Sequence, residues 1–233
     1  MPDKNEVDAG RRGWVARALA AVGTLTALPL AAAAEANGAL APPDRSGATP
    51  LEQALVRRRS VRRYAAQPLA LAAISQLLWA AQGVTSPAGR RTAPSAGALY
   101  PLELHLVATS VDGLVAGVHR YLPATHALQL SIAAPTASAL QLAARGQEAV
   151  GAAAAVVVIT AVEERTARKY GARAGRYAAF EAGAASQNLA LQAAALGLGT
   201  VVIGAFDDAA VARVLRLPPG ELPVVLMPIG APG

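Results

Sequence analysis

Two kinds of apolar pattern alternate along residues 51–233, and together they predict a chain built of both helices and strands. Helical signals, either an apolar stripe or capping residues at a segment's start, occur at residues 51–63, 71–82, 138–149 and 176–196, and from Asp207 or Asp208 to Leu215. Strand signals mark residues 102–108, 118–122, 127–130, 153–162, 201–203 and 223–229. Because a hairpin and long helices interrupt the alternation, we expect an α+β fold in which helices surround one mixed sheet.

Three of these segments carry the clearest signals. In residues 71–82 the apolar positions form one helical stripe, which consists of Leu71, Ile74, Leu77, Leu78 and Ala81. Residues 153–162 are apolar throughout and β-branched at the centre, which favours a strand buried on both faces. Residues 176–196 form the longest predicted helix, and a short polar stretch, residues 169–175, precedes it.

The first 36 residues have the features of an export signal. Arg11-Arg12 is followed by Trp14 and then by an apolar run from Ala18 to Ala34. A membrane anchor is the alternative, but the run is interrupted and shorter than the ~20 strongly apolar residues of a span. We therefore expect a twin-arginine signal at 1–36, a linker at 37–50 and one domain at 51–233. The protein would be exported to the periplasm and contact the membrane only through this signal.

Composition excludes several classes of function. The chain has no cysteine, and its three histidines are not at the spacing of a metal site, so we expect no metal. The formal net charge is +6, but aromatic residues make up only 4% of the chain, which gives poor support for nucleic-acid binding. A small ligand that carries phosphate, together with the export signal, accounts for much of the basic excess.

Two stretches could bind one anionic cofactor between them. Residues 91–101 form a loop of small residues that leaves backbone N–H groups uncovered, and residues 57–63 include five arginines. A solvated basic helix end and an ordinary turn are the alternative interpretation. The sequence has no dinucleotide fingerprint, no phosphate-binding P-loop and no Gly-x-Ser-x-Gly motif, so a reaction carried by a cofactor is favoured.

The order and spacing of several short motifs resemble the nitroreductase superfamily. These motifs are Arg58-Arg59-Ser60-Val61-Arg62, Pro94 to Pro101, Gln187-Asn188-Leu189 and Gly197-Leu198-Gly199. Residues 164–171, with Arg176-Tyr177 and Glu181-Ala182-Gly183, are similar to its SagB-type dehydrogenase branch in particular. The resemblance implies a homodimer that binds flavin mononucleotide (FMN) at the interface between its subunits.

The resemblance also implies site residues. The first group of cofactor-binding positions is Arg58, Arg59, Ser60 and Arg62, which would hold the phosphate and ring oxygens. The partner subunit would contribute Pro94, Ser95, Ala96 and Gly97, and backbone N–H groups at Gly204 and Ala205 would face the flavin N5 region. Lys169 and Tyr170 match the acid/base pair of the branch's azole-forming members.

The resemblance leads to one leading hypothesis for function and two alternatives. The leading one is an FMN-dependent dehydrogenase that transfers hydride between FMN and a small-molecule or peptide substrate, with azoline-to-azole oxidation as the specific activity. The alternatives are an NAD(P)H-dependent reductase of nitro or quinone compounds and a flavin-binding protein without turnover. Export into a compartment that lacks NAD(P)H would favour dehydrogenation or binding alone.

Overall fold

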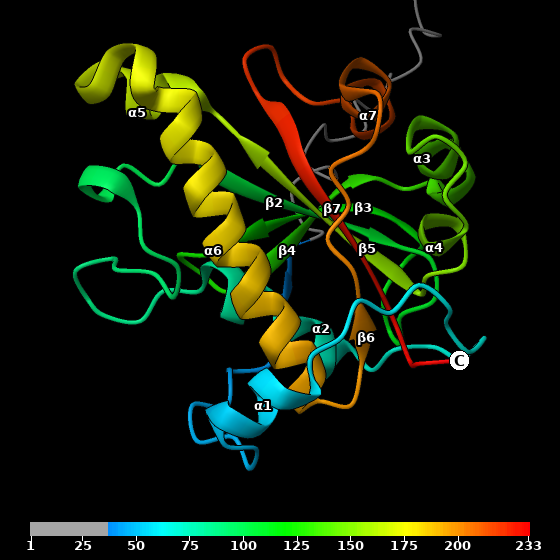
Figure 1. Cartoon of the computed structure of the whole chain (residues 1–233). Helices are drawn as coiled ribbons and strands as arrows, with labels where there is room; N and C mark the ends of the chain where they lie inside the picture. The colour runs from blue at the N-terminus through cyan, green and yellow to red at the C-terminus, as the bar shows by residue number, and fades with distance from the viewer. Residues whose placement is uncertain (1–36) are drawn as a thin grey trace, which may run out of the picture. The chain divides into compact units, whose positions relative to one another are not determined.

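Seven strands form one sheet in the order β1-β4-β3-β2-β5-β7-β6 (Figure 1). Their bounds are β1 Asn37–Ala39, β2 Leu102–Ala108, β3 Gly117–Leu122, β4 Ala127–Ile132, β5 Ala155–Ala161, β6 Gly199–Thr200 and β7 Leu222–Gly230. All six strand pairs are antiparallel, and parallel pairing at the sheet edge is limited to one bridge between Ser60 and Thr200. The α+β class is therefore confirmed, but the expectation of a mixed sheet was wrong, because all the paired strands run antiparallel.

This computed structural model describes residues 37–233. The export signal predicted at residues 1–36 lies outside the described residues. Within the described part, no helix combines the length and apolar character that crossing a membrane requires.

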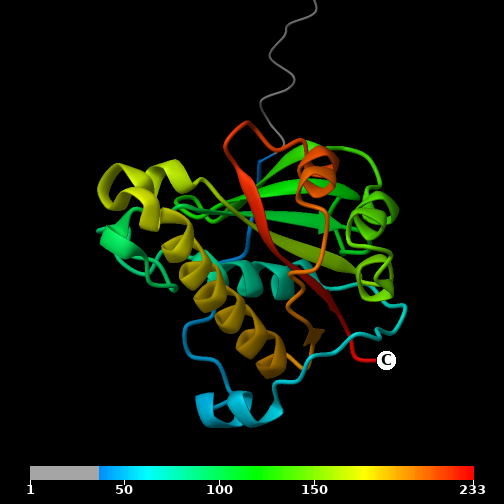
Figure 2. The same ribbon diagram turned by 45° about the horizontal axis from the view of Figure 1, so that its top comes forward.

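Helices cover both faces of the sheet (Figures 1 and 2). The helical elements are α1 Leu51–Arg57, α2 Leu71–Gln82, η2 Ala96–Ala98, α3 Ala137–Ala143, α4 Glu148–Gly151, α5 Glu163–Tyr170, η3 Gly171–Arg173, α6 Ala174–Ala195 and α7 Asp208–Leu215. Side chains of α2 and α6, such as Leu77 and Leu189, share one core with Leu104 of β2. Helices α3, α4 and α7 form a second core on the opposite face. All residues of β5 are buried between these layers, as its continuous apolar run predicts.

Two predicted helices are shorter than expected. The segment 51–63 is helical only to Arg57, because Val61 N–H donates to the Thr200 carbonyl at 2.9 Å and draws the arginine run onto the sheet edge. The segment 138–149 is broken between α3 and α4, where Arg145 and Gly146 have positive φ angles of 57° and 74°. Both interruptions depend on backbone conformations that an apolar pattern does not encode.

Residues 37–50 are not the linker that their composition suggests. Strand β1 pairs with β4, and Leu40 is buried in the core beneath it. The Ser75 hydroxyl of α2 donates to the Ala41 carbonyl at 2.7 Å. This segment is therefore part of the folded unit, because strand pairing, the burial of Leu40 and the hydrogen bond to Ser75 join it to the sheet and α2.

A buried polar cluster joins three neighbouring strands at one end of the sheet. His105 of β2 lies 2.6 Å from the Glu221 carboxylate (Nε2 to Oε1), and the Thr160 hydroxyl of β5 donates to the same oxygen. Burial alone would raise the pKa of Glu221, but the hydrogen bonds from His105 and Thr160 and the positive charge of Arg120 hold it below its ordinary value. The ionised carboxylate is therefore the form that stabilises the fold.

We expect Glu221→Gln to lower the free energy of unfolding by about 2 kcal/mol at pH 7, since it weakens hydrogen bonds to a buried charged group. A carboxylate with a lowered folded pKa stabilises the protein above its unfolded pKa of about 4.3 and loses that contribution as the pH falls through the folded value. The free energies of unfolding of the wild type and of Glu221→Gln should therefore become more similar below about pH 4. Urea unfolding across pH measures it, with the exposed Glu148→Gln as control; equal midpoints at pH 7 would contradict the expectation.

Candidate functional site

The loop between α2 and β2, residues 90–101, has an unusual backbone; we call it the Ser95 loop. Gly97, Ala98 and Tyr100 have positive φ angles of 62°, 55° and 46°. A left-handed conformation costs a residue with a side chain about 1–2 kcal/mol. Ser95 supports the turn, because its hydroxyl accepts the Tyr100 N–H at 2.8 Å. Backbone strain concentrated in one short loop is typical of functional sites.

Side chains from two helices hold this loop in place. The Glu181 carboxylate of α6 accepts the Ala96 N–H at 2.8 Å, and Arg165 of α5 donates to the Tyr100 carbonyl at 3.0 Å. Arg165 also pairs with Glu103 of β2 at 2.6 Å. Burial raises the pKa of Glu181, although the hydrogen bond from Ala96 lowers it in part. The loop conformation is thus fixed by contacts from both sides.

Lys169 and Tyr170, the predicted acid/base pair, lie at the end of α5 against Gly97. A Cβ atom added to Gly97 would lie 3.1 Å from Tyr170 Oη and 3.3 Å from Lys169 Nζ. Lys169 Nζ lies 5.4 Å from the centre of the Tyr170 ring, and Tyr170 packs edge-on against Tyr177 at 5.0 Å between ring centres. The structure therefore brings the predicted pair together with the predicted flavin loop, although Lys169 lies 72 positions after Gly97 in the chain.

Lys169 is also the only lysine in residues 37–233; the sequence has one other, Lys4. All other cationic side chains of this part except histidine are arginines, which keep their proton at any working pH. A lysine can lose its proton when it is desolvated. A count of lysines would have singled out this residue from sequence without any resemblance to a family.

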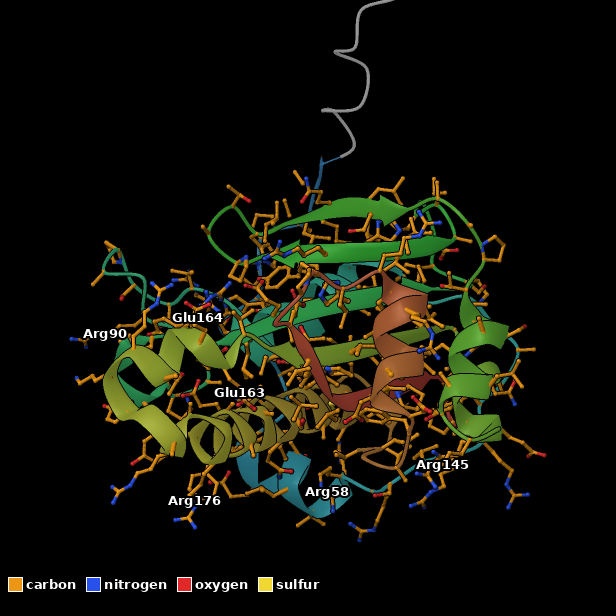
Figure 3. All side chains as sticks on the ribbon, turned by 90° about the horizontal axis from the view of Figure 1, so that it is seen from above. Arg58, Arg90, Arg145, Glu163, Glu164 and Arg176 are labelled. Carbon is orange, nitrogen blue, oxygen red and sulfur yellow. The ribbon has the colours of Figure 1, made fainter. Side chains whose placement is uncertain are left out.

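A cavity of about 330 Å³ adjoins the loop and the start of α6. Pro94, Ser95 and Ala96 line it on one side, and α6 contributes the side chains Tyr177, Phe180 and Glu181. Phe180 is 68% exposed, and the charged side chains of Glu164 and Arg176 are exposed on the adjoining helices (Figure 3). Sequence reasoning did not select Phe180, because its exposure follows only from the placement of α6.

A second cavity, of about 570 Å³, lies between α1, β6 and the C-terminal half of α6, and we call it the arginine cavity. Arg57, Arg59 and Thr200 line it, and Arg59 Nη1 donates to two carbonyls of the α1 end, Val56 and Arg58, at 2.8 Å each. Among the described residues, the buried Thr200 hydroxyl has no hydrogen-bond partner. A cavity lined by two arginines and by a threonine whose hydroxyl has no partner suits a ligand with anionic oxygens, such as a phosphate.

The predicted phosphate-binding residues are only partly assembled around this cavity. Arg59 lines it, and Ser60 forms the bridge to Thr200, but the lining residues do not include Arg58 or Arg62. Arg58 is half-buried at the end of α1 (Figure 3). Arg57, which belongs to the predicted basic stretch but not to the positions that the family resemblance implies, also lines the cavity, at the end of α1.

The remaining predicted positions, Gly204 and Ala205, follow β6 and are both exposed. The Ala205 carbonyl accepts a hydrogen bond from Gln147 Nε2 at 2.8 Å. Neither residue lines the two cavities described above. Within residues 37–233, no cluster of three His, Cys, Asp or Glu side chains is suited to hold a metal ion.

The Ser95 loop and the arginine cavity lie at opposite ends of α6 (Figure 1). Residues 177–181 of this helix border the first, and residues 190–195 border the second. At 1.5 Å per residue, the step along α6 from Glu181 to Ala190, the bordering residues nearest to each other, is about 14 Å. The two predicted stretches, residues 57–63 and residues 91–101, are therefore separated along this helix.

Comparison with known proteins places these features in one family. The chain matches the nitroreductase family over residues 55–231. MJ1384 of Methanocaldococcus jannaschii, which carries the name of a nitroreductase, is 43% identical over 180 residues, a match that covers 77% of this chain and 90% of that protein. A nitroreductase structure from Ralstonia eutropha JMP134 (reut_a1228) has a TM-score of 0.76 and 33% identity, and covers 84% of this chain and 90% of that chain.

The microcin B17-processing protein McbC of Escherichia coli is also similar. It is 32% identical over 155 residues, which cover 64% of this chain and 57% of McbC. The E. coli microcin synthetase McbBCD complex with truncated pro-MccB17 bound contains a chain that matches with a TM-score of 0.65 and 27% identity, covering 85% of this chain and 79% of that chain. This similarity supports a SagB-like branch within the family.

The approach of Gly97 to the Lys169–Tyr170 pair can be tested with two matched substitutions. Gly97→Ala and Gly89→Ala both place a side chain at a positive φ, 62° and 75°, but Gly89 has no atom within 4 Å of the added Cβ. We expect each to lose about 1 kcal/mol of stability in urea unfolding. Only Gly97→Ala should displace Lys169 and change its rate of acylation by an amine-specific reagent, followed by mass spectrometry. Equal acylation in both variants would show that the contact is not formed.

Proposed function

The chain belongs to the nitroreductase family, and from that premise we propose that it is an FMN-dependent dehydrogenase of the SagB type. The observation that carries this proposal is the contact of the Lys169–Tyr170 pair with the Ser95 loop, since it joins a proton-transfer pair to the predicted flavin loop. Oxidoreductase activity is common to the family. The choice of a dehydrogenase rests on the pair and on the similarity to McbC.

The residues of this chain fit FMN. Arg57 and Arg59 would bind its phosphate, and the Thr200 hydroxyl would donate a hydrogen bond to a phosphate oxygen. Backbone groups of residues 94–97 would contact the ring system, and the space beside Gly97 is taken by the Tyr170 and Lys169 side chains. When it is bound, FMN supplies the two-electron redox chemistry, which the side chains of this protein do not provide.

Lys169 is the base in the proposed reaction. Oxidation of an azoline to an azole removes two hydrogens, one as a proton from carbon and one as a hydride. Lys169 Nζ takes the proton, and the Tyr170 ring centre lies 5.4 Å from that nitrogen. Lys169 is exposed in the free protein, so a substrate can reach the amine directly.

A peptide is the substrate class that this proposal favours. McbC is named as a processing protein of microcin B17, and its complex was solved with truncated pro-MccB17 bound. The cavity beside the Ser95 loop is bordered by an exposed aromatic side chain, Phe180, which could pack against an azoline ring held in a peptide.

We further propose that a homodimer completes the site. The arginine cavity and the Ser95 loop lie at opposite ends of α6, so an antiparallel pairing of two α6 helices would bring the loop of one chain to the cavity of the other. Exposed apolar side chains on α1 and α6, namely Leu55, Val56 and Phe180, support burial against a second copy.

An NAD(P)H-dependent nitroreductase is the alternative. The names of the M. jannaschii and R. eutropha relatives favour it. Reduction of a nitro group does not require a base beside the substrate carbon, so that activity should survive the loss of the Lys169 amine. Substitution of Lys169 therefore distinguishes the two functions, because it should abolish azoline oxidation and spare nitro reduction.

The cofactor is tested by the absorption spectrum of the purified protein and by mass analysis of what denaturation releases. We expect flavin bands and FMN. The double variant Arg57→Ala/Arg59→Ala should bind added FMN at least about tenfold more weakly, because charge-assisted hydrogen bonds to the phosphate are lost. Arg213→Ala, an exposed arginine on α7, is the control. A colourless protein that takes up no FMN would overturn the proposal.

Catalysis and dimer assembly are tested together with Lys169→Arg, which keeps a cation but removes the proton acceptor. Azoline oxidation should fall by about 10²–10⁴-fold with FMN still bound.

Co-expression of the Lys169→Arg chain with the Arg57→Ala/Arg59→Ala chain tests whether the site is shared between two subunits. It should restore about a quarter of wild-type activity. Random pairing makes half of the dimers mixed. In each mixed dimer, one of the two sites joins the intact arginine cavity of the Lys169→Arg chain to the intact Lys169 of the other chain, so half of the sites in half of the dimers are active.

Two outcomes would contradict this account. Undiminished azoline oxidation by Lys169→Arg would remove the proposed base, and retained nitro reduction alongside it would support the alternative. Failure of the mixed dimers to regain activity, when both parent variants are folded, would show that both sets of residues act within one chain.

A further inference from the structure

Glu181 is a buried carboxylate that the proposed reaction does not use. It lies on the inner face of α6 between small residues, and only 5% of it is exposed. By contrast, the side chain of Glu164 on the neighbouring helix is 78% exposed. Burial of a carboxylate is costly unless its oxygens are hydrogen-bonded, so the contact that Glu181 makes explains why the residue is tolerated here.

That contact is with the backbone of the Ser95 loop. Glu181 Oε1 accepts the Ala96 N–H at 2.8 Å, one residue before Gly97. The loop enters its left-handed turn at Gly97, and there it meets Tyr170 and Lys169. The Glu181 carboxylate therefore fixes the backbone directly next to the position where the acid/base pair is seated.

A second anchor holds the far end of the same turn. Arg165 donates to the Tyr100 carbonyl, and it lies one helical turn before Lys169 on α5. Two side chains of α6 hold the near part of the loop. Asn188 donates to the Thr92 carbonyl at 3.3 Å, and Glu181 accepts the Ala96 N–H where the turn begins.

We propose that Glu181 is a positioning residue, whose carboxylate holds the Ala96–Gly97 turn in the conformation that seats Lys169 and Tyr170. We call this hydrogen bond between the Glu181 carboxylate and the Ala96 N–H the clamp. Its significance for catalysis rests on the proposed function, but the clamp itself is a property of the chain without cofactor. It can therefore be measured in the absence of FMN and of any substrate.

The first test is limited proteolysis of the full chain by trypsin without FMN. Arg90 and Arg91 lie in the Ser95 loop and report its opening. We expect Glu181→Ala to speed cleavage after these residues by about tenfold, because a hydrogen bond to a charged acceptor is lost. Glu181→Gln keeps an acceptor oxygen at the same reach and should stay within about twofold of the wild type. Glu148→Ala, an exposed glutamate on α4, is the control.

The second test asks whether the hydrogen bond of Glu181 to the loop affects the position of Lys169. The rate at which an amine-specific reagent acylates Lys169 should change in Glu181→Ala and not in Glu181→Gln, with Lys4 in the same chain as the reference. Should Glu181→Ala fail to fold, Glu181→Asp keeps the charge but shortens the side chain by one methylene, and it should show the faster cleavage instead.

The results of the two tests distinguish a failure of the Glu181 proposal from a failure of the proposed function. Cleavage and acylation of Glu181→Ala and Glu181→Asp at wild-type rates would overturn the clamp, and so would a Glu181→Gln variant cleaved as fast as Glu181→Ala. A protein that shows the clamp but binds no FMN would leave Glu181 as a positioning residue of the loop and refute the proposed function alone.

Discussion

The candidate site depends on one close approach, that of the Gly97 backbone to the end of α5. A Cβ at Gly97 would lie 3.1 Å from Tyr170 Oη and 3.3 Å from Lys169 Nζ, so a side chain there would push the tips of both residues back by a few tenths of an ångström. The turn that makes this possible is unfavourable, because Ala98 and Tyr100 also adopt left-handed conformations. Three hydrogen bonds offset that cost: Ser95 accepts the Tyr100 N–H, Glu181 accepts the Ala96 N–H, and Arg165 donates to the Tyr100 carbonyl. The site is therefore held by side chains that face the backbone, while the surface toward the cavity stays open for a ligand.

The sequence predicted those parts of the fold whose stability comes from a buried apolar face. Strand β5 and helices α2 and α6 follow their apolar patterns because these residues pack on the sheet. Helix α5 was not predicted, since residues 163–170 are almost entirely polar and only Thr166 is buried. Its position comes from contacts with other segments, such as that between Arg165 and Glu103. The early end of α1 has a similar origin, in the bond between Val61 and Thr200.

The same distinction applies to the site. Motif order selected Lys169, Tyr170 and residues 94–97, and the fold brings them together. Glu181, Phe180 and Thr200 could not be selected in this way, because their importance lies in what surrounds them: a backbone N–H, an open cavity and a missing hydrogen-bond partner. Each of these is a relation between segments far apart in the chain. A local pattern contains no information on such relations, whereas a rare residue type, such as a single lysine among arginines, is visible in the sequence itself.

In the proposed function, arginine and lysine have two different roles, anion binding and proton transfer. A guanidinium keeps its charge under all working conditions and binds anionic oxygens in a fixed geometry, which suits Arg57 and Arg59 in the arginine cavity. A side chain that accepts a proton must be able to lose one, and the single lysine of residues 37–233 lies beside Gly97 and Tyr170. If any basic residue served equally well at position 169, arginine would be the expected choice in a segment otherwise devoid of lysine. A lysine at this one position is what the proposed role of Lys169 as a base requires, because an amine can exchange a proton where a guanidinium keeps it.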